Sequence, residues 1–502
     1  MPTLYPRQLD AVHFTRACVA AHGAALIADD MGYGKTYEGM ASIDRGRPLL
    51  LSIPACLRGK WTDDFAAFAP GAWTLHHVEN IGAFRWPTIG ECVVVSRELL
   101  ASPKGEIVRL SRDLRQAEKD ADGSLDFAKA TMTETARKRL AQAARRAGPN
   151  TPPPDGMDVL IDEAHVYSNN KSVLSQRMRA VCRATRKAGG SVVGMTATPV
   201  LNDPPELNGL LTTLGLHKAA FPGGWWEFLR LFGGHEGRFG VTWDGEPLDA
   251  EIAEGLRRVS IRRLLDDVEP RIPPYLHPRM FHVDVDAGVL ALEAEAARDP
   301  RLAPLHARGL DVYAYMEDEG ERPKKLGREV SRVAFEWTSR IGAALSACKL
   351  PRAIAWAEEM ERAGEPAMIG GPYVEPIRIL GSRPGWACID GATTPAKRHE
   401  IVLALRRGKL RGVATTIRAG GVGIDCQAAA FGLILDPDWV PAWTRQWFAR
   451  MRRTGQTRAV QPDFLRVEGH PMEVRKQELV RKKRRLMQAV DASAVRPEVA
   501  PC

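Results

Sequence analysis

The sequence lacks any long apolar run. A membrane-spanning helix takes about 20 consecutive apolar residues, and no stretch of this chain has that length and character. The first ten residues, MPTLYPRQLD, also lack the basic start and apolar core of a signal peptide. We therefore expect a cytoplasmic protein with no membrane partner.

Cysteine is sparse and is not arranged in pairs. The chain has eight cysteines in 502 residues, and no two of them form a Cys-x-x-Cys motif. Some lie in apolar stretches, such as Cys92 before Val93, Val94 and Val95. This pattern disfavours a disulfide framework or a structural zinc site and favours buried, reduced thiols.

Charge of one sign is in only small excess. The 70 Lys and Arg residues face 61 Asp and Glu residues, which gives a net charge of +9. This excess permits an anionic partner without requiring one. Hydrophobic residues make up 44% of the chain and charged residues 26%, which is the composition of a globular protein and excludes a disordered one.

Short apolar runs recur along the chain with helical material between them. Runs that are apolar on both faces suit buried parallel strands, and their alternation with helices predicts an α/β fold. Two such sets, separated by a charged middle segment, predict two doubly wound lobes with parallel sheets. The runs are residues 25–28, 49–53, 92–95, 159–161 and 192–195, then 367–369, 386–389, 412–415 and 433–435.

Two segments interrupt this pattern. Residues 101–156 are charged, rich in Ala and end in Pro152-Pro153-Pro154, which predicts a helical insertion followed by a stiff loop. Residues 263–340 are charged and helical in character, with prolines near their start. We expect an N-terminal lobe over 1–262, a linker over 263–285, a C-terminal lobe over 286–470 and a basic tail over 471–502.

A candidate phosphate loop follows the first predicted strand. It reads Ala28-Asp-Asp-Met-Gly-Tyr-Gly-Lys-Thr36 and leads into a predicted helix. Backbone N–H groups at a helix start attract phosphates. We expect residues 31–36 to cradle the nucleotide, with Lys35 reaching the phosphates and the Thr36 hydroxyl binding Mg²⁺. These residues are Met31, Gly32, Tyr33, Gly34, Lys35 and Thr36. The alternative is an accidental Gly-Lys-Thr turn, because Asp29 stands where the full motif has Gly.

Two further motifs lie at the ends of predicted strands. Residues 159–161 lead into Asp162-Glu163-Ala164-His165, and adjacent carboxylates after a buried strand suit Mg²⁺-assisted phosphoryl transfer. Asp162 would hold the metal ion, and Glu163 would orient and deprotonate the attacking water. Thr196-Ala197-Thr198-Pro199 follows a later strand and could sense the γ-phosphate. The alternatives are a solvated acidic turn and a simple proline-terminated turn.

Together these motifs resemble the SNF2 family of superfamily 2 helicase-type ATPases. That family's first motif also lacks the first Gly, and Asp162–His165 is similar to its DEAH-form second motif. Leu4-Tyr5-Pro6-Arg7-Gln8 resembles its glutamine motif, which implies that Gln8 reads adenine. Residues 340–356 resemble the annealing-helicase branch of the family.

The second half carries matching motifs. Residues 418–425 resemble motif V, which implies that Gly423 and Asp425 lie at the nucleotide. Asp436-Pro-Asp-Trp439 is similar to a signature typical of SNF2 proteins. Residues 446–456 resemble motif VI, which places Arg450 and Arg453 at the two arginine positions that neutralise the γ-phosphate.

The resemblance implies an enzyme that hydrolyses ATP with Mg²⁺, depends on duplex or branched DNA, and translocates along DNA to remodel protein–DNA complexes. By analogy the source is a bacterium or phage. One alternative is an RNA-dependent DEAH-type helicase. Another is a non-hydrolysing DNA-binding subunit of a restriction or defence complex.

The C-terminal segment is strongly basic. Residues 471–490 contain seven Lys or Arg against two Glu. This predicts a DNA-backbone contact or a brace on the second lobe. A solvated terminal helix is the alternative.

Overall fold

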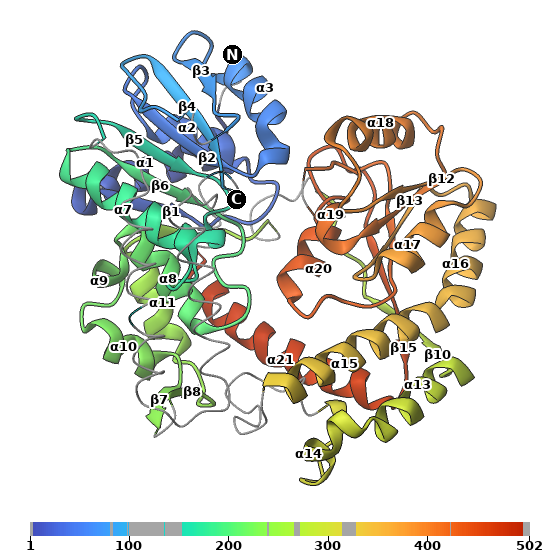
Figure 1. Ribbon diagram of the computed structural model, residues 1–502. Coiled ribbons are helices and arrows are strands. Elements are labelled where there is room, and N and C mark those ends of the chain that lie inside the picture. Colours follow the sequence, from blue (N-terminus) through green and yellow to red (C-terminus); the bar gives the residue numbers. More distant parts are fainter. Residues whose placement is uncertain are drawn as a thin grey trace, which may run out of the picture. The chain divides into compact units, whose positions relative to one another are not determined.

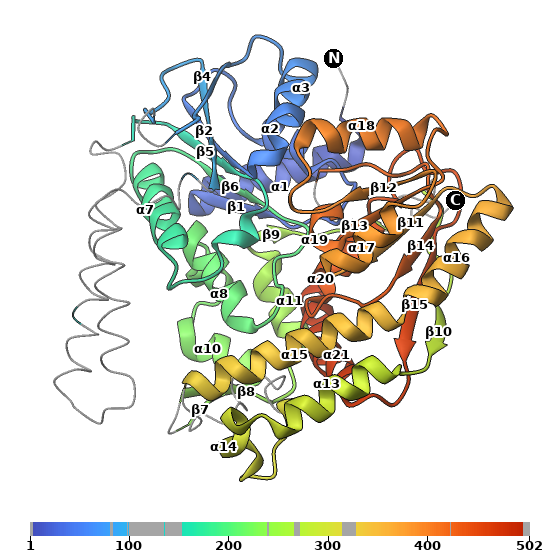
Figure 2. The ribbon, with the colours of Figure 1, turned by 45° about the vertical axis from the view of Figure 1, so that its right-hand side comes forward.

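The computed structural model describes residues 4–80, 84–97, 99, 135, 153–237, 240–265, 272–313, 328–421 and 423–494. The chain divides into two compact units, residues 1–268 with 486–502 and residues 269–485. Figures 1 and 2 show a sheet with flanking helices in each unit. Nearly all of the helical insertion expected over residues 101–156 lies outside the described residues.

The first unit is built on a parallel sheet. Its seven described strands lie in the order β3, β4, β2, β5, β6, β1, β9. In that order the strands span Thr74–His77, Glu91–Ser96, Leu49–Ile53, Asp158–Ile161, Val192–Met195, Ala24–Ile27 and Ser260–Ile261. The central strands are buried throughout, which is the pattern expected for strands covered on both faces.

Side chains that alternate along these strands enter two separate cores. Leu50, Val159 and Val192 pack on one face of the sheet, while Leu51 and Leu160 pack on the other. The helices of this unit are α1 (Pro6–His22), α2 (Lys35–Ser42), α3 (Arg58–Phe68), α7 (Val173–Lys187), α8 (Pro204–Leu214), α9 (His217–Ala220), α10 (Gly224–Leu231) and α11 (Asp249–Arg257). Short 3₁₀ turns span Ala55–Leu57 and Ala164–Tyr167, and a hairpin joins β7 (Gly234–Gly237) to β8 (Gly240–Trp243).

The second unit has its own parallel sheet. Its described strands lie in the order β10, β15, β14, β11, β13, β12. They span Arg279–Val283, Gln461–Val467, Phe431–Ile434, Ala367–Gly371, Gly412–Thr416 and Trp386–Ile389. Strand β10 lies within the segment expected to be a linker and pairs along its whole length with β15. The two parallel α/β lobes confirm the fold class expected from the sequence.

The helices of the second unit pack on both faces of its sheet. Residues of α16 and α17 enter one core with Ile369, and residues of α18 and α20 enter another with Met368. The helices are α13 (Ala287–Arg298), α14 (Ala303–His306), α15 (Arg328–Cys348), α16 (Leu350–Ala363), α17 (Val374–Gly381), α18 (Pro395–Arg406), α19 (Ile417–Gly420) and α20 (Pro441–Phe448), with a 3₁₀ turn over Pro300–Leu302.

The basic C-terminal segment forms one long helix, α21 (Pro471–Asp491). Met472 near its start is buried in the second unit, whereas Leu486, Ala489 and Val490 near its end are buried in the core of the first. The segment is therefore anchored at both ends, and it is not a solvated terminal helix. Among the described helices, none has the length and apolar character that crossing a bilayer requires.

Candidate functional site

The three motifs of the first unit meet at one edge of its sheet. Strands β5, β6 and β1 are neighbours and run parallel, so their carboxyl ends lie side by side. The phosphate loop follows β1, the acidic motif follows β5 and the Thr-Ala-Thr segment follows β6. Ligands of open α/β sheets bind at this edge.

The phosphate loop has the backbone of a tight cradle. Gly32 and Gly34 have φ values of 85° and 92°, in the region that side chains disfavour. A Cβ on Gly34 would lie 2.3 Å from Gln8 Nε2, so a larger residue would displace the Gln8 side chain in addition to adopting an unfavourable φ. Thr36 lies in the first turn of α2, where backbone N–H groups have no partner within the helix.

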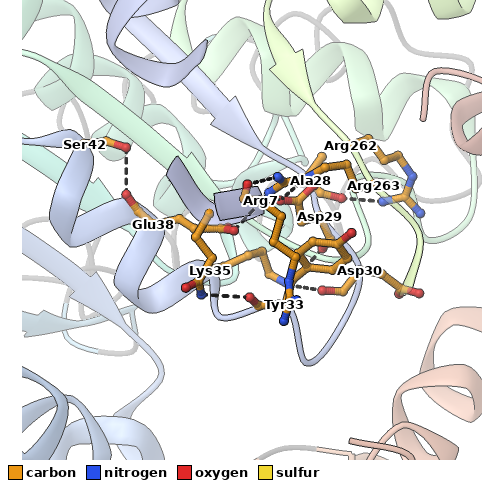
Figure 3. A network of polar contacts seen from close by, with 11 residues as sticks. Arg7, Ala28, Asp29, Asp30, Tyr33, Lys35, Glu38, Ser42, Arg262 and Arg263 are labelled. Carbon is orange, nitrogen blue, oxygen red and sulfur yellow. Dashed lines mark hydrogen bonds and ion pairs between the residues drawn. The ribbon is translucent and has the colours of Figure 1, made fainter. Parts of the chain in front are cut away.

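Lys35 is held by the loop itself. Its Nζ donates hydrogen bonds of 2.8 Å to the carbonyl oxygens of Asp29 and Asp30 (Figure 3). Burial lowers the pKa of Lys35, while the charges of Glu163 and Asp29 act in the opposite direction. A lysine so placed can exchange backbone carbonyls for phosphate oxygens.

Asp162 and Glu163 take different positions at the end of β5. The Asp162 carboxylate accepts hydrogen bonds from Trp61 Nε1 at 2.9 Å and from the backbone N–H of Glu163 at 2.9 Å. Burial, reinforced by the charge of Glu163, raises the pKa of Asp162 to about 6, and Lys35 opposes that shift. The charge of Lys35 thus favours the ionised form of Asp162, and the charge of Glu163 favours the protonated form of Lys35.

Glu163 has an unusual backbone. Among the described residues other than glycine it alone has a positive φ, of 50°. Such a conformation costs about 1–3 kcal/mol and is often found at functional sites. Glu163 Oε2 lies 3.4 Å from Nδ1 of His165.

His165 joins the acidic motif to the Thr-Ala-Thr segment. Its Nδ1 lies 2.9 Å from Thr196 Oγ1 and 3.4 Å from Thr198 Oγ1. Burial, with the charge of Arg97, lowers the pKa of His165 to about 4, so the ring is neutral at neutral pH. The two segments therefore share a buried hydrogen-bonded contact.

Gln8 contacts the phosphate loop in this structure. Its Nε2 donates to the Tyr33 carbonyl at 3.1 Å, and its Oε1 accepts from the Tyr5 backbone N–H at 3.0 Å. These contacts place Gln8 beside the phosphate loop, and its expected contact with adenine stays a prediction.

The oxygen donors at this edge suit magnesium. Thr36 offers a hydroxyl and Asp162 a carboxylate, and Mg²⁺ is commonly bound by one or two carboxylates together with substrate phosphates. Gly32 and Gly34 place no side chain in the loop that leads to Thr36. The residues present therefore fit a Mg²⁺–nucleotide complex.

The remaining predicted residues lie in the second unit. Arg453 forms an ion pair with Asp425, and Arg450 Nε donates to the Gly421 carbonyl at 2.9 Å. Gly423 has a φ of 72°. Burial, with the charge of Arg406, lowers the pKa of Arg453 to about 10, which leaves it charged at neutral pH. The structure thus brings motifs V and VI together within this unit.

Known proteins match this chain over nearly all of its length. Residues 358–455 match the helicase conserved C-terminal domain. The DNA annealing helicase and endonuclease ZRANB3 of Mus musculus is 23% identical over 482 residues, 93% of this chain. Protein CHROMATIN REMODELING 4 of Arabidopsis thaliana is 23% identical over 484 residues, 91% of this chain.

The chain is therefore similar to helicase-type ATPases of the SNF2 family over nearly all of its length. It spans 39% of the length of the mouse relative and 20% of that of the plant relative. Among solved structures, the Sulfolobus solfataricus SWI2/SNF2 ATPase core in complex with dsDNA is 16% identical, with a TM-score of 0.38. That comparison covers 98% of this chain and 93% of the other.

The sequence motifs left some residues of the candidate site unpredicted. Arg263, at the start of the expected linker, is buried in the first unit beside Asp29 and Glu38. Trp61 donates its indole N–H to Asp162, a contact that the sequence did not predict. One signal could have pointed to Arg263, the Arg262-Arg263 pair directly after a short strand. An arginine that such a position buries usually has a carboxylate partner.

Proposed function

We propose that this chain is an ATP-dependent translocase of the SNF2 type on double-stranded DNA. It would hydrolyse ATP when bound to DNA, move along the duplex and thereby remodel protein–DNA complexes or branched DNA. The observation that carries this proposal is the arrangement of Lys35, Asp162 and Glu163 at the carboxyl ends of β1 and β5, the two strands that flank β6. DNA is proposed as the partner because the chain is similar to SNF2-family proteins.

Each residue would have a distinct role in hydrolysis. Lys35 holds the β- and γ-phosphates, and Thr36 and Asp162 hold Mg²⁺, which neutralises phosphate charge when bound. Glu163 orients the attacking water and accepts its proton, for which its carboxylate must be ionised.

The second unit would contribute positive charge. Arg450 and Arg453 each have a guanidinium that could neutralise charge developing on the γ-phosphate. In the structure Arg453 pairs with Asp425. We propose that Arg453 exchanges this carboxylate for phosphate during the catalytic cycle, so that hydrolysis depends on conformational change.

Binding to DNA would be mainly through phosphates. Such contacts are independent of sequence and weaken as salt concentration rises. We expect ATP hydrolysis to be stimulated most by duplex or forked DNA, and weakly by single-stranded DNA or RNA.

One set of assays tests this function. ATP hydrolysis is measured with duplex DNA, forked DNA, single-stranded DNA and RNA, and triplex displacement reports translocation. The Glu163→Gln variant should lose about 10²–10⁴-fold in hydrolysis rate and keep DNA binding. Lys35→Ala should lose hydrolysis because it loses phosphate contacts.

The outcomes separate the alternatives. Stimulation by RNA above DNA would favour an RNA-dependent helicase. The absence of hydrolysis with every nucleic acid would favour a DNA-binding subunit of a larger complex. Wild-type rates in the Glu163→Gln variant would refute the assignment of the active site.

A further inference from the structure

Arg263 lies at the centre of a buried group of charges next to the phosphate loop. Its side chain is 6% exposed, and its Nε donates to both carboxylate oxygens of Asp29 at 3.1 Å. Its Nη2 donates to Glu38 Oε1 at 2.9 Å. Asp29 and Glu38 are each fully buried. We call Arg263, Asp29 and Glu38 the phosphate-loop cluster (Figure 3).

The same arginine is also joined to the loop through backbone atoms. The N–H of Asp30 donates to the carbonyl of Arg263 at 3.0 Å, and the N–H of Ala28 donates to that of Ile261 at 2.8 Å. The pairing between β1 and β9 therefore continues past β1 into the start of the loop.

Two further contacts surround the guanidinium. Its Nη1 donates to the carbonyl of Arg7, in the first turns of α1. Its Cζ lies 4.7 Å from the centre of the Tyr33 ring, which is 1% exposed. The guanidinium thus contacts Asp29 at the start of the loop, Tyr33 in its middle and Glu38 in the helix that follows it.

This cluster depends on its one arginine. A buried carboxylate without a partner is strongly unfavourable, and two neighbouring carboxylates repel each other. Arg263 donates to both with a planar fork of donors, which lysine cannot reproduce. Burial, with the charge of Asp29, raises the pKa of Glu38 to about 8, and Arg263 opposes that shift. Without it, Asp29 would tend to leave its buried position, and the loop that begins at Asp29 would move with it.

Such a movement would affect Lys35 directly. The carbonyl of Asp29 is one of the two acceptors that hold the Lys35 ammonium. A displaced Asp29 would therefore change the position of the residue expected to bind the phosphates.

We propose that Arg263 is a positioning residue that fixes the phosphate loop in its nucleotide-binding conformation. It touches no expected phosphate position and acts through Asp29 and Glu38. The chain leaves the first unit after Val268, so the same residue links the loop to the segment that joins the two units. This inference rests on the proposed nucleotide-binding function.

The test measures nucleotide affinity in the full chain with a fluorescent ADP analogue. Arg263→Ala should weaken binding about 10- to 100-fold, because it removes hydrogen bonds to charged groups. Arg263→Lys keeps the charge and loses the fork, so it should fall between the wild type and Arg263→Ala. In steady-state hydrolysis KM for ATP should rise more than kcat falls.

Arg47→Ala is the matched control. Arg47 donates to the carbonyls of Gly156 and Gly189 and lies 3.7 Å from Asp158, at the opposite ends of the strands. Its loss should lower thermal stability and leave nucleotide affinity unchanged. A general loss of stability would affect both arginine variants alike.

A double variant separates positioning from packing. In the Arg263→Ala background, Asp29→Asn replaces the carboxylate that accepts most of the lost hydrogen bonds and should restore several-fold of the lost affinity. No rescue, or wild-type affinity in both Arg263 variants, would overturn the proposal. If Arg263→Ala does not fold, Arg263→Lys alone and combined with Asp29→Asn decides by the same criteria. Failure of the wild type to bind the analogue would instead refute the proposed function.

Discussion

Two buried clusters of this molecule are built alike and differ in what surrounds them. The phosphate-loop cluster places one guanidinium between two carboxylates in the first unit. In the second unit Lys349 lies between Asp436 and Glu473, with its Nζ 2.5 Å from Glu473 Oε1. We call these three residues the α21 cluster, because Glu473 lies in that helix.

The cations of the two clusters suit their surroundings. Arginine, with its fork of donors, contacts a loop through several atoms at once. Lys349 is fully buried and lies between α15 and α16, where a compact ammonium joins three segments. Burial disfavours its charge, but Asp436 and Glu473 outweigh burial and raise the pKa of Lys349.

The difference lies in the backbone to which each cluster is attached. The phosphate-loop cluster joins a glycine-containing loop that we expect to bind the nucleotide phosphates. The α21 cluster joins the end of β14 to two helices, all of which have regular hydrogen bonding. Similar electrostatics should therefore control ligand affinity in one unit and stability alone in the other.

The largest expected effect tests whether the second unit has a catalytic role besides this structural one. Arg453→Ala should reduce ATP hydrolysis by about 10³–10⁵-fold, because the guanidinium would neutralise charge in the transition state. Nucleotide binding should persist, since the phosphate loop belongs to the first unit. Single-turnover hydrolysis and titration with the fluorescent nucleotide measure the two quantities.

Arg458→Ala is the control for that variant. Arg458 is 42% exposed and pairs with Glu365 in the same unit. Its loss should change neither the rate of ATP hydrolysis nor the affinity for the nucleotide. If Arg453→Ala abolished nucleotide binding as well, Arg453 would have a structural role and the comparison between the units would need revision.

The sequence predicted those parts of the site whose residues are adjacent in the chain. The phosphate loop and Asp162–Glu163 follow apolar strands, and parallel strands bring such ends to one edge. The contact of Arg263 with Asp29 could not be predicted in this way, because it depends on β9 pairing with β1 across more than 200 residues.

The strands of the fold were predictable where their sequence is apolar throughout. Strands buried on both faces, such as β2 and β5, have the continuous apolar runs by which they were recognised. Strand β10 reads Arg-Met-Phe-His-Val, is mostly exposed and lies at the edge of its sheet, so it has no such run. Edge strands of this kind are formed by pairing with a neighbour, which the local sequence does not record.

The second largest expected effect concerns the α21 cluster. Lys349→Met should destabilise the second unit by about 3–5 kcal/mol, because it leaves two buried carboxylates without their cation. Chemical unfolding followed by tryptophan fluorescence measures this loss, and nucleotide affinity of the folded variant should be unchanged. A loss below about 1 kcal/mol would mean that Lys476, near the same carboxylates, suffices to neutralise them.

The pH range of this contribution follows from the two pKa shifts. Lys349 and the other nearby cations hold the pKa of Asp436 below its ordinary 3.8 despite burial, so the stability that Asp436 provides is present above that value and is lost as the pH falls below it. The raised pKa of Lys349 means that its contribution is present below 10.5 and is lost as the pH rises beyond that value.

The smallest expected effect concerns the exposed charges of α21, on the same helix that contributes Glu473. Arg481, Lys482 and Arg484 are exposed, and each phosphate contact adds about 0.9 to the slope of log affinity against log salt concentration. Replacing all three by Gln should therefore flatten that slope for duplex DNA by up to about 2.7. Substitution is preferable to deletion because Leu486 and Val490 belong to the core of the first unit.

The matched control neutralises three exposed arginines elsewhere in the second unit, Arg298, Arg332 and Arg362. This control has the same change in net charge, so a purely global electrostatic effect would flatten both slopes equally. A slope that changes only in the α21 variant would assign DNA contacts to that helix, in addition to its buried structural role. An unchanged slope would restrict α21 to the structural role and sharpen the separation between buried and exposed charges.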